Sequence, residues 1–103
     1  MLNQFSRTEL LLGKEAMERL SRARVAVFGI GGVGGYTVEA LVRSGVGAID
    51  LIDDDKVCLT NLNRQIIATR STVGKYKVEV MRDRILDINP DCKVEVHLSL
   101  IHI

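Results

Sequence analysis

A run of closely spaced glycines is the part of this sequence whose chemistry is most specific. Gly29-Ile-Gly-Gly-Val-Gly34 follows an apolar stretch, Val25–Phe28, and precedes helix-forming sequence. A glycine fingerprint between a buried strand and a helix is typical of nucleotide binding. Gly29 permits a tight turn, Gly31 lets a phosphate approach the backbone, and Gly34 lets the helix pack on the strand. Because the start of a helix offers free N–H groups and a partial positive charge, the sequence predicts binding of a nucleotide phosphate chain.

An aspartate in the right place for a ribose follows the glycines. Asp53 stands 24 positions after Gly29, at the end of a second apolar run, Ala48–Asp53. A carboxylate at this point can accept hydrogen bonds from ribose hydroxyls. NAD and ATP both carry such a ribose, so the glycines and Asp53 leave a nicotinamide-dependent oxidoreductase and an ATP-binding enzyme open.

A polar segment after the second apolar run favours a triphosphate. Thr60-Asn-Leu-Asn-Arg-Gln65 holds Arg64, whose planar guanidinium suits phosphate oxygens, and Lys77 follows as a second cation. A dehydrogenase needs no positively charged side chain at this point, because its pyrophosphate is already held by the glycine loop. From spacing alone, Arg64 and Lys77 could also be ordinary solvated residues on the protein surface.

Strands alternating with helices are expected to hold these residues. Ser6 and Glu9 predict a capping box and Phe5 and Leu10 a hydrophobic staple, so a helix should start at Arg7. Further helices are predicted over 14–22, 32–44 and 74–88 and a short helical turn over 60–65 with Thr60 as its cap, and strands over 25–29, 48–53 and 93–97. The order predicts an α/β fold, the N-terminal half of a doubly wound, Rossmann-like parallel sheet preceded by a helical segment.

The bulk composition is that of an ordinary globular protein. The 103 residues suffice for one small domain, and a formal net charge of +1 gives no strong attraction to nucleic acid or membranes. No apolar stretch is long enough to cross a bilayer, and the N-terminus lacks a signal-peptide pattern. Cys58 and Cys92 form no C-x-x-C pair and are interpreted as free thiols of a cytoplasmic protein.

The last six residues, 98–103, differ in kind from the rest. Leu98-Ser-Leu-Ile-His-Ile103 is what the start of a common transposase sequencing adapter encodes, and we interpret it as read-through after a truncated coding sequence. Residues 1–97 would then be the N-terminal part of an ATP-binding adenylating domain, with the rest missing.

Five blocks resemble the ubiquitin-activating-like adenylating enzymes, which include the thiamine-biosynthesis and molybdopterin-synthase adenylyltransferases. The blocks are Phe5-Ser-Arg-Thr8, Gly29-Ile-Gly-Gly-Val-Gly34, Asp53-Asp-Asp-Lys-Val57, Asn61-Leu-Asn-Arg-Gln65 and Val73-Gly-x-x-Lys77. Within this superfamily the chain is most similar to the tRNA threonylcarbamoyladenosine dehydratase branch, through residues 57–66 and Ile88-Asn-Pro-Asp-Cys92.

The resemblance implies a role for each matched residue. The ATP phosphates would be cradled by Gly29, Gly31, Gly32 and Gly34, and the ribose held by Asp53. The triphosphate would be lined by Asn61, Arg64 and Lys77, with Gln65 beside them. Arg64 and Lys77 would stabilise charge on the departing pyrophosphate, and Arg7 would reach the ATP of the partner subunit in a homodimer. The Mg²⁺-binding aspartate of these enzymes lies beyond the third strand and is expected in the missing part.

The implied reaction is the activation of a carboxylate by ATP. The carboxylate attacks the α-phosphorus and gives an acyl-adenylate and pyrophosphate, a reaction in which the enzyme positions reactants and stabilises charge. In the dehydratase branch the carboxylate belongs to the threonylcarbamoyl group of a tRNA adenosine, which then cyclises and expels AMP. Lys75, Lys77, Arg82 and Arg84 are a possible basic stripe for the tRNA, although a solvated helix face is the simpler interpretation.

Three alternatives stay open. The substrate could be the C-terminus of a ubiquitin-like sulfur carrier, with a sulfur-transfer protein as partner. The chain could belong to an NAD-dependent oxidoreductase. It could also be a non-catalytic partner subunit, against which the intact set of ATP-binding residues argues.

Overall fold

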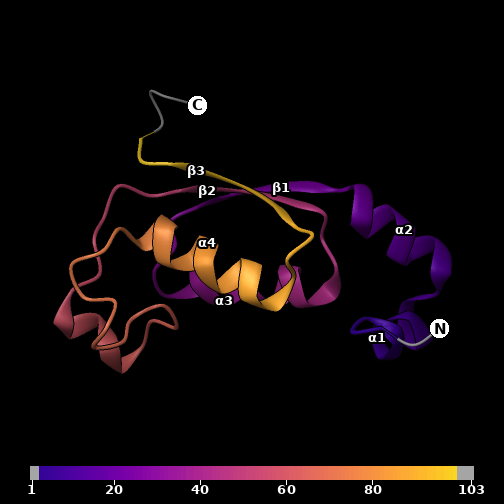
Figure 1. Ribbon diagram of the computed structural model, residues 1–103, viewed down its shortest axis with the longest axis horizontal. Coiled ribbons are helices and arrows are strands. Elements are labelled where there is room, and N and C mark those ends of the chain that lie inside the picture. The colour runs from indigo at the N-terminus through magenta and orange to yellow at the C-terminus, as the bar shows by residue number, and fades with distance from the viewer. Residues whose placement is uncertain (1–2, 100–103) are drawn as a thin grey trace.

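Three parallel strands form the centre of the molecule, for which the computed structural model describes residues 3–99 (Figure 1). The strands are β1 (Arg24–Phe28), β2 (Ala48–Ile52) and β3 (Lys93–His97), in the order β1-β2-β3. Val27 pairs with Leu51, and Leu51 pairs with Val96. All three carboxyl ends therefore meet at one edge of the sheet, where ligands bind in such folds.

Two helices cover a single face of this sheet. Helices α3 (Val33–Ser44) and α4 (Lys77–Ile88) lie side by side beneath the strands in Figure 1. One face of α4 is buried, since Val78, Met81 and Ile85 recur at helical spacing and are at most 1% exposed. They pack in one core with buried side chains of α3 and the strands, among them Val38, Val42, Ile49 and Leu51.

An ionic cluster ties α3 to α4 at the edge of the core. Glu39 on α3 is 8% exposed. Its Oε1 accepts a hydrogen bond of 2.8 Å from Nη2 of Arg43 and another of 2.8 Å from Nη2 of Arg84 on α4. Burial acts to raise the pKa of Glu39, but the bonds from Arg84 and Arg43 outweigh it and leave that pKa below its ordinary value. The cluster fixes the spacing of the two helices whose first turns face the candidate site.

The opposite face of the sheet carries charged side chains and no helix among the described residues. Phe28 is 61% exposed there, and Arg24 donates to both carboxylate oxygens of Asp50 at 2.6 and 2.7 Å. His97 Nε2 lies 3.2 Å from Asp50 Oδ1. Hydrogen bonding to Arg24, helped by His97, lowers the pKa of Asp50 to about 2. We call Arg24, Asp50 and His97 the sheet-face cluster.

Two helices precede the sheet, α1 (Ser6–Leu12) and α2 (Lys14–Arg22), separated at Gly13 as predicted. The predicted capping box of Ser6 and Glu9 is wrong. Phe5 is the N-cap, and the turn is closed by Asn3, whose side chain accepts from the N–H of Phe5 at 2.8 Å. The staple is also wrong, because Leu10 is 86% exposed.

Two further boundaries differ from the sequence prediction. The short turn is a 3₁₀-helix, η1 (Leu59–Asn63), capped at Cys58 rather than at Thr60. Helix α4 begins at Lys77, three residues later than predicted, because Gly74 (φ 89°) donates its N–H to Val57 and Tyr76 forms a β-bridge with Lys56. Backbone bonds to the loop after β2 thus replace the first helical turn.

The predicted α/β fold class is confirmed, with parallel strands alternating with helices behind a helical N-terminal segment. Within residues 3–99 no helix has the length and apolar character needed to cross a membrane. Cys58 and Cys92 are free thiols, as predicted. Most of the predicted read-through segment, residues 100–103, lies outside the described residues, so that interpretation stays a prediction.

Candidate functional site

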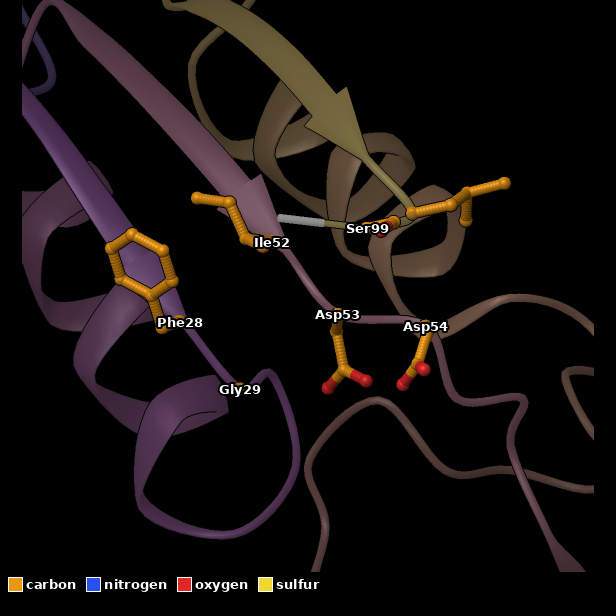
Figure 2. A pocket seen from close by; sticks show the side chains of 7 residues that line it. Phe28, Gly29, Ile52, Asp53, Asp54 and Ser99 are labelled. Carbon is orange, nitrogen blue, oxygen red and sulfur yellow. The ribbon is translucent and has the colours of Figure 1, made fainter. Parts of the chain in front are cut away.

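A cleft opens at the carboxyl ends of the three strands. It has a volume of about 420 Å³ and is lined by residues that end β1 and β2 and follow β3: Phe28, Gly29, Ile52, Asp53, Asp54, Leu98 and Ser99. Figure 2 shows the carboxylates of Asp53 and Asp54 pointing the same way, beside the turn that starts at Gly29. The cleft combines an apolar wall with carboxylate oxygens, which suits a nucleoside.

The glycine loop between β1 and α3 has the backbone geometry of an anion cradle. Gly29 and Gly32 have φ values of 86° and 52°, which side chains rarely tolerate. Within the described residues, the N–H groups of Gly31 and Gly32 donate no hydrogen bond. They lie at the N-terminus of α3, where free N–H groups and the helix dipole attract a phosphate.

Gly34 is needed for contact between the loop and the helix. A Cβ atom there would lie 1.7 Å from the carbonyl oxygen of Gly29. The backbone at Gly29 and at Gly34 cannot move far enough to relieve this clash, so only glycine lets α3 start so close to β1. The packing role predicted for Gly34 agrees with this geometry.

Asp53 holds the glycine loop as well as facing the cleft. Its Oδ2 accepts the N–H of Ile30 at 2.8 Å, and its Oδ1 accepts the N–H of Asp55 at 2.9 Å. Each carboxylate oxygen has a second lone pair, so Asp53 can still accept hydrogen bonds from ribose hydroxyls. The bond to Ile30 is a role that the sequence did not indicate, because a carboxylate 23 residues away gives no local signal.

The polar segment after β2 lies against the glycine loop. A Cβ atom on Gly31 would lie 2.7 Å from Nε2 of Gln65, so the Gln65 amide covers this glycine. Its neighbour Arg64 is exposed and donates Nη1 to the carbonyl of Thr60 at 3.1 Å and to Asn63 Oδ1 at 2.9 Å. These are surface contacts that water can replace, so the guanidinium is free to turn toward a ligand.

Lys77 is tied to the loop that carries Asp53. It is 7% exposed, its N–H donates to the carbonyl of Asp55 at 3.0 Å, and its Nζ lies 3.9 Å from Asp55 Oδ2. A solvated surface position is therefore excluded for Lys77. Because Lys77 is buried and Arg84 binds Glu39, the residues 75–84 do not form a continuous exposed basic stripe.

Asn61 and Arg7 are placed differently from the other predicted site residues. Asn61 is 7% exposed, and its Oδ1 accepts the N–H of Cys58 at 2.8 Å, so this oxygen stabilises η1. Arg7 belongs to α1, which lies at the other end of the sheet from the glycine loop (Figure 1). The structure thus gathers the glycines, Asp53, Gln65 and Lys77 and leaves Arg7 outside this chain's own site.

Three consecutive carboxylates follow β2 and lie close together. Oxygens of Asp53, Asp54 and Asp55 lie within 4.8 Å of one another. Both oxygens of Asp53 already accept backbone N–H groups, and Asp55 faces the Lys77 ammonium. The Lys77 ammonium beside Asp55 disfavours a cation there, so we assign no metal ion to these three carboxylates.

The sequence missed the apolar wall of the cleft and the partner of Lys77. Phe28 and Ile52 are the last residues of their strands, a position that could have indicated the wall. The pairing of Asp55 with Lys77 has no sequence signal, because their spacing follows no helical or strand period.

Comparison with known proteins places this geometry in a family. The model of the ThiF family matches residues 5–102. A tRNA threonylcarbamoyladenosine dehydratase from Bacillus subtilis is 58% identical over 94 residues, which are 91% of this chain and 37% of that protein. A probable molybdopterin-synthase adenylyltransferase from Gracilaria tenuistipitata is 41% identical over 90 residues, 87% of this chain and 25% of that protein.

A solved structure agrees with these similarities. The crystal structure of the Escherichia coli tRNA N6-threonylcarbamoyladenosine dehydratase in complex with ATP superposes with a TM-score of 0.92 and 51% identity. The match covers 93% of this chain and 40% of that one. This chain therefore spans well under half the length of these relatives.

Proposed function

This chain belongs to the ThiF family, and from that premise we propose that the full-length protein binds ATP and uses it to adenylate a carboxylate. The observation that carries the proposal is the convergence of four segments at one edge of the sheet. The glycine loop offers free N–H groups, Asp53 faces the cleft, Gln65 brings the Arg64 segment to the loop, and buried Lys77 follows. A triphosphate needs this combination of donors and cations.

We further propose that the carboxylate is the threonylcarbamoyl group of a tRNA adenosine. The support is the identity of 58% and 51% to dehydratases named for that substrate. Such an enzyme would activate the carboxylate, close a ring on the same group and release AMP, with net loss of water. It would work in the cytoplasm, where tRNA is modified.

The residues of this chain divide the work of the adenylation step. The N–H groups of Gly31 and Gly32 bind phosphate oxygens, and Asp53 orients the ribose and so the α-phosphorus. Arg64 leaves its contacts with Thr60 and Asn63 and neutralises the charge that develops on pyrophosphate. Lys77, held by Asp55, adds a second positive charge that is fixed before the ligand arrives.

Two further components of the reaction are proposed, a Mg²⁺ ion and an arginine that acts between subunits. When bound, Mg²⁺ would neutralise phosphate charge, and its protein ligand is expected in the part that follows β3. Arg7 would act in the site of a partner subunit of a homodimer. The position of α1 away from the chain's own glycine loop is consistent with that role.

Pyrophosphate exchange into ATP tests the proposed adenylation. We expect Arg64→Ala in the full-length protein to lower the substrate-dependent exchange rate by about 100-fold or more while the thermal unfolding temperature is unchanged. Arg22→Ala, an exposed arginine of α2 outside the site, serves as the matched control. Exchange retained at the control's level would refute the role of Arg64.

A second candidate substrate is the C-terminus of a ubiquitin-like sulfur carrier. The support is the 41% identity to the Gracilaria relative, which is named a probable molybdopterin-synthase adenylyltransferase. AMP release with modified tRNA alone would favour the dehydratase, and release only with a carrier protein would favour the alternative. NADH binding without ATP binding would instead indicate an oxidoreductase and refute both.

A further inference from the structure

The space that a side chain on Gly31 would fill is occupied by Gln65. A Cβ atom built on Gly31 would lie 2.7 Å from Nε2, 2.9 Å from Cδ and 2.9 Å from Oε1 of Gln65. Real Cβ atoms essentially never approach non-bonded heavy atoms to less than 3.0 Å. The amide of Gln65 therefore lies flat against the phosphate-binding loop at Gly31.

A second observation shows that this amide is not an ordinary packed side chain. Oε1 of Gln65 is buried and has no hydrogen-bond partner among the described residues. A buried acceptor without a donor is costly, and native structures accept it mainly where a ligand or water completes the bond. Gln65 is otherwise well anchored, since its N–H donates to Asn61 and its carbonyl accepts the N–H of Ala68.

We infer that Gln65 is a positioning residue for the nucleotide, and that residue 31 is glycine chiefly to seat its amide. The amide joins the glycine loop to the segment that carries Arg64, so both groups reach the triphosphate in a fixed relation. Nε2 is a donor for a phosphate oxygen, and a water bound with the phosphates is the missing donor for Oε1. The inference rests on the proposed function, because ATP binding is its readout.

Alanine substitution is expected to have opposite effects at Gly31 and at Gly34. At Gly34 the added carbon would meet backbone, which cannot move. At Gly31 it would meet the end of a flexible side chain, which can swing away. Gly31→Ala should therefore leave the fold intact and displace only the Gln65 amide.

A double-mutant cycle in the full-length protein tests the inference. Gly31→Ala and Gln65→Ala are each expected to weaken ATP binding about tenfold, with unfolding temperatures close to that of the native protein. The double variant should bind ATP as each single variant does, because the displaced amide is already absent. If the two losses multiply to about 100-fold, Gly31 serves phosphate approach independently of Gln65, and the inference is overturned.

Two further variants separate the polarity of the amide from its shape. Gln65→Met keeps the length of the side chain and removes its hydrogen bonds, and Gln65→Glu places a negative charge against the phosphates. We expect a raised KM for ATP in pyrophosphate exchange for both, with the larger increase for Gln65→Glu. Gln4→Glu makes the same chemical change at a glutamine that binds the carbonyl of Ile88 instead, and should leave KM unchanged.

The outcomes distinguish this inference from the proposed function. Native-like ATP binding by Gln65→Met would refute the role of the amide while leaving ATP binding itself established. If the native protein bound no ATP, the proposed function would fail first. The positioning role of Gln65 for that nucleotide would be overturned with it, whereas native-like binding by Gln65→Met would overturn that role alone.

Discussion

Replacing Asp53 should loosen the glycine loop before any nucleotide is present. Its carboxylate accepts the N–H of Ile30, a residue with 0% exposure, at 2.8 Å and the N–H of the exposed Asp55 at 2.9 Å. In Asp53→Ala, water can replace the second bond but not the first. The lost charge-assisted bond and the buried N–H left behind should lower the free energy of unfolding by about 2 kcal/mol. Asp53→Asn keeps one acceptor oxygen and should lose about 1 kcal/mol.

Urea denaturation of the full-length protein measures this order of stabilities. Asp54→Ala is the control for the loss of one negative charge, because Asp54 is exposed and makes no hydrogen bond within residues 3–99; its effect should stay below about 0.5 kcal/mol. Equal stabilities for Asp53→Ala and Asp54→Ala would refute the reasoning, since the carboxylate would then hold nothing. A loss of ATP affinity in Asp53→Asn beyond its small loss of stability would report the ribose contact.

Three other substitutions probe the frame around the site. Gly34→Ala should cost about 3 kcal/mol or prevent folding, because the added carbon would lie 1.7 Å from the carbonyl of Gly29, and circular dichroism with thermal unfolding checks this. The pKa of Asp50 is about 2, below its ordinary 3.8, so the ionised carboxylate stabilises the fold. Because Arg24 is exposed, this contribution to the free energy of unfolding is only about 1 kcal/mol. It is present above pH 4 and is lost as the pH falls toward 2. Urea unfolding of Asp50→Asn should show that pH dependence reduced, and an unchanged profile would contradict the assignment. Glu39→Ala removes the ion pairs that join α3 to α4 and should lower the free energy of unfolding by about 1–2 kcal/mol. An unchanged urea midpoint would show that these ion pairs do not stabilise the fold.

The strands and the long helices could be predicted from the sequence because their patterns are local. The apolar run before Gly29 and the helical spacing of Val78, Met81 and Ile85 each report burial directly. Gly45, with φ 103°, ends α3 as expected of a glycine at that point. These elements needed no information from distant residues.

The predictions that failed concern places where a distant or competing contact decides. The side chain of Asn3 closes the turn before α1, so the pattern of Ser6 and Glu9 is not used. The start of α4 is delayed by backbone bonds from Gly74 and Tyr76 to the loop after β2. Within the site, the residue types were predictable, but the seat of Gln65 on the glycine loop depends on how two loops meet in space.

The sheet-face cluster has a consequence for how the protein is made. Strands β1 to β3 are neighbours in both sequence and space, so they can pair before the residues that follow β3 are synthesised. At that stage the face of Arg24, Asp50 and His97 is open to other nascent chains, as are the outer edges of β1 and β3, which have no partner strand within residues 3–99. Charged, mutually paired side chains on this face tolerate water and discourage two half-finished sheets from associating. The same charges that make the face a poor hydrophobic surface thus make it a safe one to expose during synthesis.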